Sequence, residues 1–223
     1  GWARSKGSAW ERSAPAPAGI DGGAAPEHLG SARTPLPPAY WGTESGLRCL
    51  DHVVEGVWDE AWSHHITRLM VLGNLAMLHG VDPWDLTEWM WSSFIDGAEW
   101  VMLPNVIGMS QWADGGRMAT KPYAAGGNYI DTMSDYCTDC RYDRKQRVGD
   151  DACPFTTLYW DFLDRHHDRF VKNARIARQV RACGSRGRHD RQTDWPGGVS
   201  RRGSRTDRRA RGWLYRLLLG PGA

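Results

Sequence analysis

Hydrophobic residues recur at helical spacing through the middle of the chain, from about residue 39 to residue 181. Apolar side chains lie three and four positions apart along 50–61 and again along 66–77, and Gly80 supplies a helix stop. This stretch predicts one long helix or two helices in series. No strand-like alternation of apolar and polar residues stands out, so the pattern predicts an all-α core.

Two further helices are predicted, separated by a long loop. Asp82 as N-cap and Pro83 at the first helical position predict a helix that extends to about Phe94. The segment 103–129 breaks repeatedly at Pro and Gly, so we expect it to be largely loop. After Cys153, a closing helix is expected because six apolar residues fall on one face. They are Phe155, Leu158, Tyr159, Phe162, Leu163 and Phe170.

Composition changes at both ends of the chain. Gly, Ala, Pro and Ser dominate 1–38, which we expect to be a disordered or non-native leader. Arg and Gly dominate 184–223, which we expect to be an irregular tail, while 39–183 forms the helical domain. The basic tail could bind phosphates nonspecifically. The same bias at both ends would also arise from a GC-rich coding sequence read out of frame.

Charge and length narrow the class of protein. The 223 residues carry a formal charge of +2, which permits a nucleic-acid partner without requiring one. No apolar run approaches the roughly 20 residues of a membrane span, and 1–13 lacks the apolar segment of a signal peptide. We expect a cytoplasmic monomer with no membrane contact. In a reducing compartment, the odd number of five cysteines favours metal ligation over a disulfide framework.

Three cysteines lie close together in the sequence. Cys137 and Cys140 in "CTDC" have a spacing that lets one tight turn aim both thiolates at a metal, and Cys153 follows in "ACPF". The fourth ligand is Cys49 or Cys183, and Cys49 is favoured because it begins the first long helix. Spacing alone does not distinguish zinc from a [4Fe–4S] cluster. Unpaired structural cysteines are the remaining alternative.

A long run of the sequence resembles a known family. "SHHITRLMVLGNLAMLHGVDPWDLTEWMWSSFIDGAEWVMLPN", together with "YCTDC" and "ACPFTTLYWDFL", is similar to the C-terminal half of the iron–sulfur bacterial cryptochromes and photolyases. The resemblance covers about 39–181. It implies the C-terminal part of the all-α, FAD-binding photolyase domain. It also implies a [4Fe–4S] cluster bound by Cys49, Cys137, Cys140 and Cys153.

Light-driven repair of UV-damaged DNA is the activity that this resemblance implies. In (6-4) photolyases, FAD donates an electron to a pyrimidine lesion flipped out of the duplex, because stacked bases are otherwise inaccessible. His65 and His64 match the histidines beside the lesion, with His65 as the expected proton donor. Arg68 and Asp96 match the Arg and Asp that contact the flavin and pair with each other. Without the resemblance, a capping histidine and a plain salt bridge would be preferred.

Further site residues are carried over in the same way. Asn105 lies in the cofactor-side loop, as does Gln111, without a separate role for either. Trp89 and Trp41 match family positions for electron transfer, and Tyr129 is assigned to the same role. Tyr123 and Lys121 match the lesion and DNA side, where the lysine would contact phosphate. For each aromatic residue, plain packing is the alternative.

The sequence also departs from the family. Met102 occupies a position where some members have a glutamate near flavin N5, and a thioether accepts hydrogen bonds weakly. No antenna domain precedes residue 39, so an antenna chromophore is expected only in a full-length protein. Most of the FAD phosphate contacts are expected to be missing too, which would leave a fragment with reduced or no activity. The alternatives are a cryptochrome-like photoreceptor and a nonenzymatic, metal-stabilised helical module whose tail binds nucleic acid.

Overall fold

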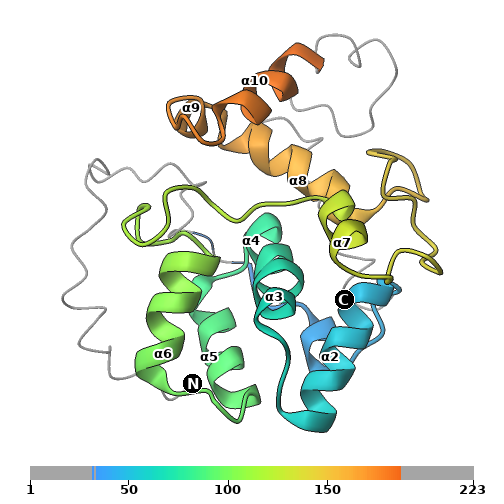
Figure 1. The fold of residues 1–223 in the computed structure, drawn as a ribbon, viewed down its shortest axis with the longest axis vertical. Helices are drawn as coiled ribbons and strands as arrows, with labels where there is room; N and C mark the ends of the chain where they lie inside the picture. The colour runs from blue at the N-terminus through green and yellow to red at the C-terminus, as the bar shows by residue number, and fades with distance from the viewer. Residues whose placement is uncertain (1–31, 33, 187–223) are drawn as a thin grey trace.

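The computed structural model describes residue 32 and residues 34–186, which form a set of packed helices (Figure 1). Within this part of the chain no β-strand forms, and the β-pairing consists of two isolated bridges, Thr34 with Val81 and Asp143 with Ala152. The all-α expectation is confirmed for the described residues. Most of the predicted leader and tail lies outside them. The described packing begins at Thr34, whose backbone also bonds Gly80 and Asp82.

The first predicted helical stretch is two helices in series. A short 3-10 helix, η2 (Pro38–Trp41), leads into α2 (Arg48–Glu60), which buries its apolar face. α2 ends at Ala61, which takes the left-handed conformation with φ 51°. The left-handed region is strained for a residue with a Cβ atom. The Ala61 carbonyl accepts the amide of Ile95, so a tertiary contact also fixes this bend.

The second helix of the series widens in its middle. It begins as α3 (His65–Thr67), continues as the π-helical η3 (Arg68–Gly73) and finishes as α4 (Asn74–His79), where Gly80 with φ 77° ends it. A π-helical turn inside an α-helix leaves carbonyls free for other partners and is frequent at functional sites. Here the Gly73 carbonyl accepts the side-chain amide of Gln111 at 2.9 Å.

Part of the expected loop is helical, so that prediction is wrong for 104–110. After α5 (Pro83–Ser93), whose Asp82 cap forms as predicted, the chain builds α6 (Glu99–Leu103) and the π-helical η4 (Pro104–Ser110). Pro104 lacks the amide that an α-helix would use, and a π turn can accommodate that loss. η4 packs on η3 so closely that a Cβ atom on Gly73 would lie 2.1 Å from the Ser110 hydroxyl.

The closing helix is divided into three pieces, which corrects the prediction of one helix. α7 (Gly127–Met133) is followed by a long loop, then α8 (Pro154–Arg165), α9 (His167–Phe170) and α10 (Ala177–Arg186). The first break falls at the buried His166, whose ring lies 4.8 Å from that of Phe162. Of the six predicted face residues, all but the partly buried Tyr159 are buried.

One buried polar residue fastens a loop to the helical core. The Asn74 amide nitrogen donates to the Ala125 carbonyl at 2.8 Å, and its oxygen accepts the Ala125 amide at 3.1 Å. Asn74 is 1% exposed, so these bonds satisfy a polar group that would otherwise be costly to bury. The irregular segment 111–126 is thereby tied to α4. The largest fully buried side chains around it include Trp89, Tyr40, Phe155, Phe162 and Phe170.

Candidate functional site

Arg68 is held in one orientation by three different groups. Its Nε donates to the Ser63 carbonyl at 2.7 Å, and its Nη1 donates to Asp96 at 2.8 Å. The guanidinium also lies 4.0 Å from the centre of the Phe94 ring, a cation–π contact. The Arg68 side chain is 16% exposed and that of Asp96 is 54% exposed. The structure thus brings together the two residues that the sequence pairs, at the edge of the helical core.

His64 and His65 play different structural parts. His64 is the N-cap of α3, because its Nδ1 accepts the Ile66 amide at 3.1 Å. The side chain of His65, the first residue of α3, is exposed, and no hydrogen bond or ion pair of this side chain is found among the described residues. Arg68 follows one turn later on the same helical run. His65 is therefore the histidine whose ring nitrogens are open to a bound molecule.

Aromatic rings connect the Arg68 side with the outer surface of α2. Phe94, beneath the Arg68 guanidinium, lies 6.0 Å from the buried Trp89. Trp89 in turn packs edge-on against Tyr40 at 5.2 Å and donates its indole N–H to the Tyr40 carbonyl at 3.0 Å. The indole of Trp58 donates to the same carbonyl at 3.2 Å.

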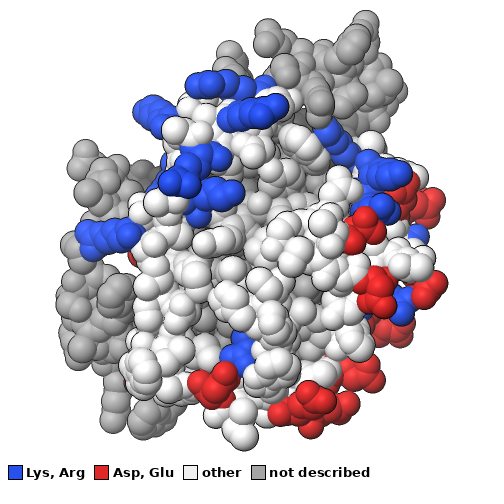
Figure 2. All heavy atoms as spheres, viewed as in Figure 1, with Lys and Arg blue, Asp and Glu red and all other residues white. Residues whose placement is uncertain are grey.

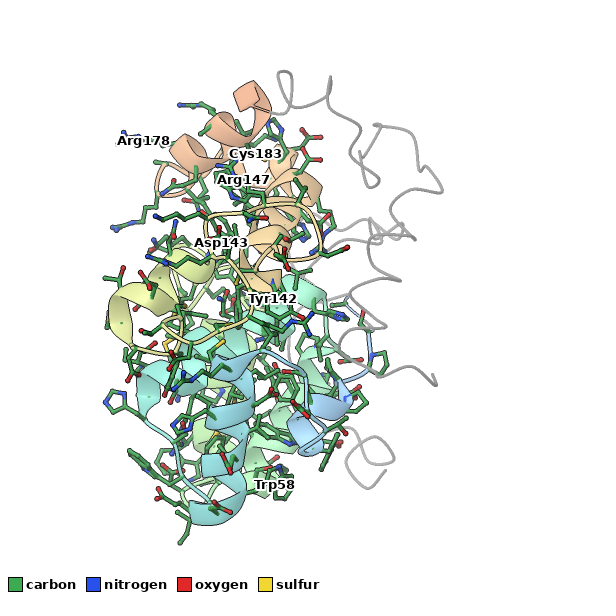
Figure 3. The ribbon with its side chains drawn as sticks, turned by 90° about the vertical axis from the view of Figure 1, so that its right-hand side faces the viewer. Trp58, Tyr142, Asp143, Arg147, Arg178 and Cys183 are labelled. Atoms are coloured by element: carbon green, nitrogen blue, oxygen red, sulfur yellow. The ribbon has the colours of Figure 1, made fainter. Side chains whose placement is uncertain are left out.

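The aromatic series ends at the surface. The ring of Trp58 lies 6.1 Å from that of Trp41, and Trp41 is 58% exposed whereas Trp89 is 1% exposed. Figure 3 shows Trp58 on α2, at the end of the molecule opposite α10. The structure therefore connects Trp89 and Trp41 through Tyr40 and Trp58, two residues that the sequence reasoning did not select. In the sequence, each of these two residues was visible only as an aromatic residue outside the periodic pattern.

Large apolar side chains are exposed around the Arg68–Asp96 pair. Trp62 and Trp91 are 47% and 39% exposed, and Ile95 and Trp100 are about four-fifths exposed. Exposed apolar groups of this size, gathered near a polar pair, are typical of a surface that contacts another molecule or another part of a longer protein. They come from the α2–α3 connection, from α5 and its end, and from α6.

Residues of the expected cofactor-side loop differ in exposure and in hydrogen bonding. Asn105 of η4 is exposed, and its side-chain amide donates to the Val101 carbonyl of α6 at 2.8 Å. Met102 is buried, so its thioether faces the protein interior. Gln111 bonds η3 and η4 together and is 2% exposed, which makes it a structural residue.

The four predicted ligand cysteines, called here the cysteine set, come from three places in the chain. Cys49 lies in the first turn of α2, and Cys153 is the N-cap of α8. Cys137 and Cys140 lie on the turn after α7. The cysteines of the helix ends are buried and those of the turn are partly exposed. Arg48 pairs with Asp139 and so fastens the turn to the start of α2.

The thiols of the cysteine set influence one another electrostatically. Burial raises the pKa of the Cys49 thiol well above its usual range, and the other three thiols add to that rise. Burial likewise raises the pKa of Cys137 to about 11. Metal ions bind thiolates, so binding here would release protons. Across residue 32 and residues 34–186, no group of three or more His, Cys, Asp or Glu side chains stands in the geometry of a metal-ion site.

The surroundings of the cysteine set fit a bound group in two respects. A Cβ atom on Gly127 would lie 2.9 Å from the Cys153 sulfur, so only glycine lets α7 approach this closely. The buried Tyr142 hydroxyl has no hydrogen-bond partner among the described residues. Cys140 and Cys153 both contribute to the rise in its pKa, after burial itself. A buried donor without a partner beside thiols is suited to a sulfur acceptor.

The lesion-side candidates lie on another part of the surface. Tyr123 and Tyr129 are each a little over a third exposed, and Lys121 is exposed on the same segment. Tyr129 lines a hollow of about 220 Å³ together with Tyr159 and Trp160. The structure places Tyr129 in this hollow on α7, whereas Trp89 and Trp41 belong to the aromatic series around Tyr40.

No membrane-crossing element is found among the described helices, none of which is long and apolar enough for that purpose. No protein-family model matches the chain. Over 142 residues, or 64% of its length, the chain is 53% identical to a (6-4) photolyase of Agrobacterium fabrum (strain C58 / ATCC 33970). The chain is thus similar to a photolyase over this stretch. It spans 28% of the length of this photolyase.

A second relative is shorter. Over 107 residues the chain is 31% identical to "Uncharacterized protein R855" of Acanthamoeba polyphaga mimivirus, and this match covers 80% of that protein and 48% of the chain. The similarity to a (6-4) photolyase and the all-α fold of the described residues agree with the resemblance drawn from the sequence. The roles of individual site residues remain predictions.

Proposed function

We propose that the chain is the part of a (6-4)-type photolyase that supports the flavin, faces the lesion in UV-damaged DNA and carries an iron–sulfur cluster. The observation that supports this best is the position of Arg68. It is fixed by Asp96, Ser63 and Phe94 at the start of an aromatic series, one turn after the open His65. A plain surface salt bridge does not require so many supports.

With FAD bound, light-driven transfer of an electron to a pyrimidine lesion is the chemistry supplied. The chain contributes position and charge. Asp96 fixes the guanidinium of Arg68, which would present a positive charge to bound FAD. The Asp96 side chain is 54% exposed, so its carboxylate would also be able to accept from a flavin or ribityl donor. Trp89, buried behind Phe94, would supply an electron for photoreduction, and Tyr40, Trp58 and Trp41 extend that series to solvent.

Proton transfer is assigned to His65. Its side chain is exposed and has no partner among the described residues, so both ring nitrogens are available to a bound molecule. His64 has a ring nitrogen committed to the Ile66 amide, which fixes the start of α3 and so places His65. Flipping the lesion exposes the atoms to which this proton would pass.

The cysteine set would hold a [4Fe–4S] cluster. Its thiolates connect α2, the turn after α7 and α8, which are far apart in the sequence, so a cluster there would hold the closing helices against the first helix. Zinc would use the same thiolates, and elemental analysis distinguishes the two. The proposed role of the cluster is structural.

The first test is the composition of anaerobically purified protein, measured by absorption spectrum and by iron, sulfide, zinc and FAD analysis. The proposal predicts about four iron and four sulfide per chain, together with resolved flavin bands after addition of FAD. In a full-length photolyase that contains this chain, light-dependent repair of a (6-4) oligonucleotide should disappear in His65→Ala. Repair that persists in this variant would contradict the role of His65, and zinc without iron would contradict the cluster.

A cryptochrome-like photoreceptor is the second candidate, because the aromatic series around Tyr40 would support flavin photoreduction without any lesion. Photoreduction in light that is unaffected by lesion-containing DNA would favour this candidate. The nonenzymatic module of the sequence analysis depends on a tail that lies outside the described residues, and it predicts no flavin.

A further inference from the structure

A small hollow lies between α7 and α8, and the segment just before α7 forms its edge. Its volume is about 220 Å³, below the roughly 300 Å³ at which pockets begin to enclose a drug-sized molecule. This volume suits one planar ring system better than a whole cofactor. The described residues that line it, called here the α7–α8 hollow, are Ala124, Ala125, Gly126, Asn128, Tyr129, Thr156, Tyr159 and Trp160.

Three aromatic rings belong to the lining of the α7–α8 hollow. Tyr129 comes from α7, while Tyr159 and Trp160 are neighbours on α8 whose ring centres lie 5.4 Å apart, edge to face. The Arg147 guanidinium lies 3.9 Å from the centre of the Trp160 ring, a cation–π contact that holds this ring in place. Proteins bind unpaired nucleobases of any sequence by stacking them on aromatic side chains of this kind.

Hydrogen bonds fix the walls of the hollow without using its aromatic side chains. Asn74 bonds both main-chain groups of Ala125. The Thr156 hydroxyl accepts the Gly127 amide at 3.1 Å and donates to the Arg144 carbonyl at 2.9 Å, so α8 is tied to the start of α7. A site that is already ordered loses less conformational entropy when a ligand binds.

Several polar groups of the lining are left for a ligand. Among the described residues, no hydrogen bond involves the side-chain amide of Asn128 or the hydroxyls of Tyr129 and Tyr159. Burial raises the pKa of Tyr159, so its hydroxyl stays neutral and keeps a proton to donate. An amide and two hydroxyls both donate and accept, which the edge of a nucleobase requires.

Charge and polarity together narrow the class of ligand. All eight residues of the described lining are uncharged, and Figure 2 shows most Lys and Arg gathered toward the top of the molecule and Asp and Glu along its lower and right-hand edges. The hollow therefore does not select an ion. A purely aliphatic group would leave the polar groups of the lining unpaired, which is costly once water is displaced. A neutral, flat ring with a hydrogen-bonding edge satisfies both the aromatic and the polar groups.

We propose that the α7–α8 hollow binds one unstacked nucleobase, which stacks on its rings and forms hydrogen bonds at its edge. One source is DNA, for example the base that loses its partner when a lesion is flipped out, and this source rests on the proposed function. A free nucleoside offers the same chemistry. The hollow itself rests on the contacts of its lining.

The fluorescent base 2-aminopurine serves as the probe, because its emission falls when it stacks on another ring. It is offered as the free deoxyriboside, opposite an abasic site in a duplex, and correctly paired in the same duplex. Titration with the full chain in the dark measures affinity independently of flavin and repair.

Three variants of the full chain test the hollow. Tyr129→Leu removes a ring. Gly126→Val fills space, because a Cβ atom there would meet Thr156 and Tyr159 at ordinary contact distances of 3.4 Å and 3.7 Å. Trp100→Leu is the matched control, since Trp100 lies on α6 outside the hollow and is about four-fifths exposed. Circular dichroism establishes that each variant is folded.

The unaltered chain should quench the probe, and its affinity should fall about tenfold in Tyr129→Leu and in Gly126→Val, with little change in Trp100→Leu. Tighter binding of the unpaired base in the duplex than of the deoxyriboside would support the hollow with DNA as the source, and equal affinities would support it with a free nucleoside. Absence of quenching, or an equal loss in Trp100→Leu, would overturn the proposal. Loss of repair in a full-length photolyase with this quenching intact would instead remove the proposed function.

Discussion

Trp89 and Trp58 donate their indole N–H groups to the same acceptor, the backbone carbonyl of Tyr40. One tryptophan approaches from the core and the other from the surface, so a single carbonyl joins a buried ring to a half-exposed one. These two hydrogen bonds fix η2 against both α2 and α5 and hold the aromatic series in place.

Substitution at these two tryptophans should have unequal effects on stability. Trp89→Phe removes a buried donor and part of a buried ring, and we expect a loss of about 2 kcal/mol in the free energy of unfolding. Trp58→Phe should cost about 0.5 kcal/mol or less, because the ring is half exposed and the carbonyl keeps its other donor. Guanidinium titrations followed by circular dichroism would measure both, and equal losses would contradict the shared-acceptor arrangement.

The two histidines should separate stability from activity. His64→Ala removes the cap of α3 and should lower the free energy of unfolding by about 1 kcal/mol. His65→Ala should change it by no more than about 0.5 kcal/mol, while it should abolish light-driven repair in a full-length photolyase that contains this chain. Thermal unfolding and a repair assay on the same preparations test this, and a fully stable His64→Ala variant would show that its bond to Ile66 has no energetic role.

Metal content should depend on the cysteine set and not on Cys183. Cys153→Ser is expected to lose most of the iron and sulfide, because the remaining three thiolates cannot complete the ligand set. Cys183→Ser is the matched control, since Cys183 donates to the Trp160 carbonyl on α8 and is not among the thiols that raise the pKa of Cys49. Iron and sulfide per chain, measured colorimetrically, decide the matter. If Cys183→Ser lost the cluster equally, the choice of Cys49 as fourth ligand would be wrong.

Gly127 should be intolerant of a methyl group where Gly56 is not. A Cβ atom on Gly127 would lie 2.9 Å from the Cys153 sulfur, so Gly127→Ala should cost about 1–3 kcal/mol and disturb metal binding. Gly56 lies in α2 with nothing within 4 Å of the new atom, and Gly56→Ala should stabilise the protein by about 1 kcal/mol. Thermal unfolding of the two variants would reveal these opposite signs, and similar melting temperatures would contradict the close approach.

The unpaired Tyr142 hydroxyl predicts an effect that depends on the metal. In metal-free protein, Tyr142→Phe should leave stability unchanged or raise it by about 1 kcal/mol, because an unsatisfied buried donor is removed. In iron-loaded protein the same change should lower the reduction potential measured by voltammetry, because hydrogen bonds to cluster sulfur influence that potential. An unchanged potential would place the hydroxyl away from the cluster.

Local signals in the sequence predicted some elements well. The cap at Asp82 and Pro83 marked the start of α5, and the stop at Gly80 marked the end of α4. η4 was missed because Pro104 and Gly108 normally interrupt helices. The structure uses Pro104 to begin a wider turn, and it packs Gly108 against Asp114 and Met118. Such packing is decided by residues distant in the sequence.

The candidate site could be predicted from the sequence only in part. The pairing of Arg68 with Asp96 followed from the resemblance, but the contribution of Phe94 to it depends on how α5 ends. Tyr40 acts through a backbone carbonyl, which has no side-chain signature in the sequence. The contact of Asn173 with the loop at Thr120 could not be foreseen, because α9 and α10 were expected to be one helix.

Asn74 holds residue 125 through main-chain atoms alone. Any amino acid except proline offers the same amide and carbonyl there, so position 125 can accumulate substitutions without loosening the loop. Position 74 has no such latitude, because a side chain must supply both the donor and the acceptor. Relatives of the chain should therefore vary in amino acid at position 125 of the loop and keep asparagine at position 74 of the helix.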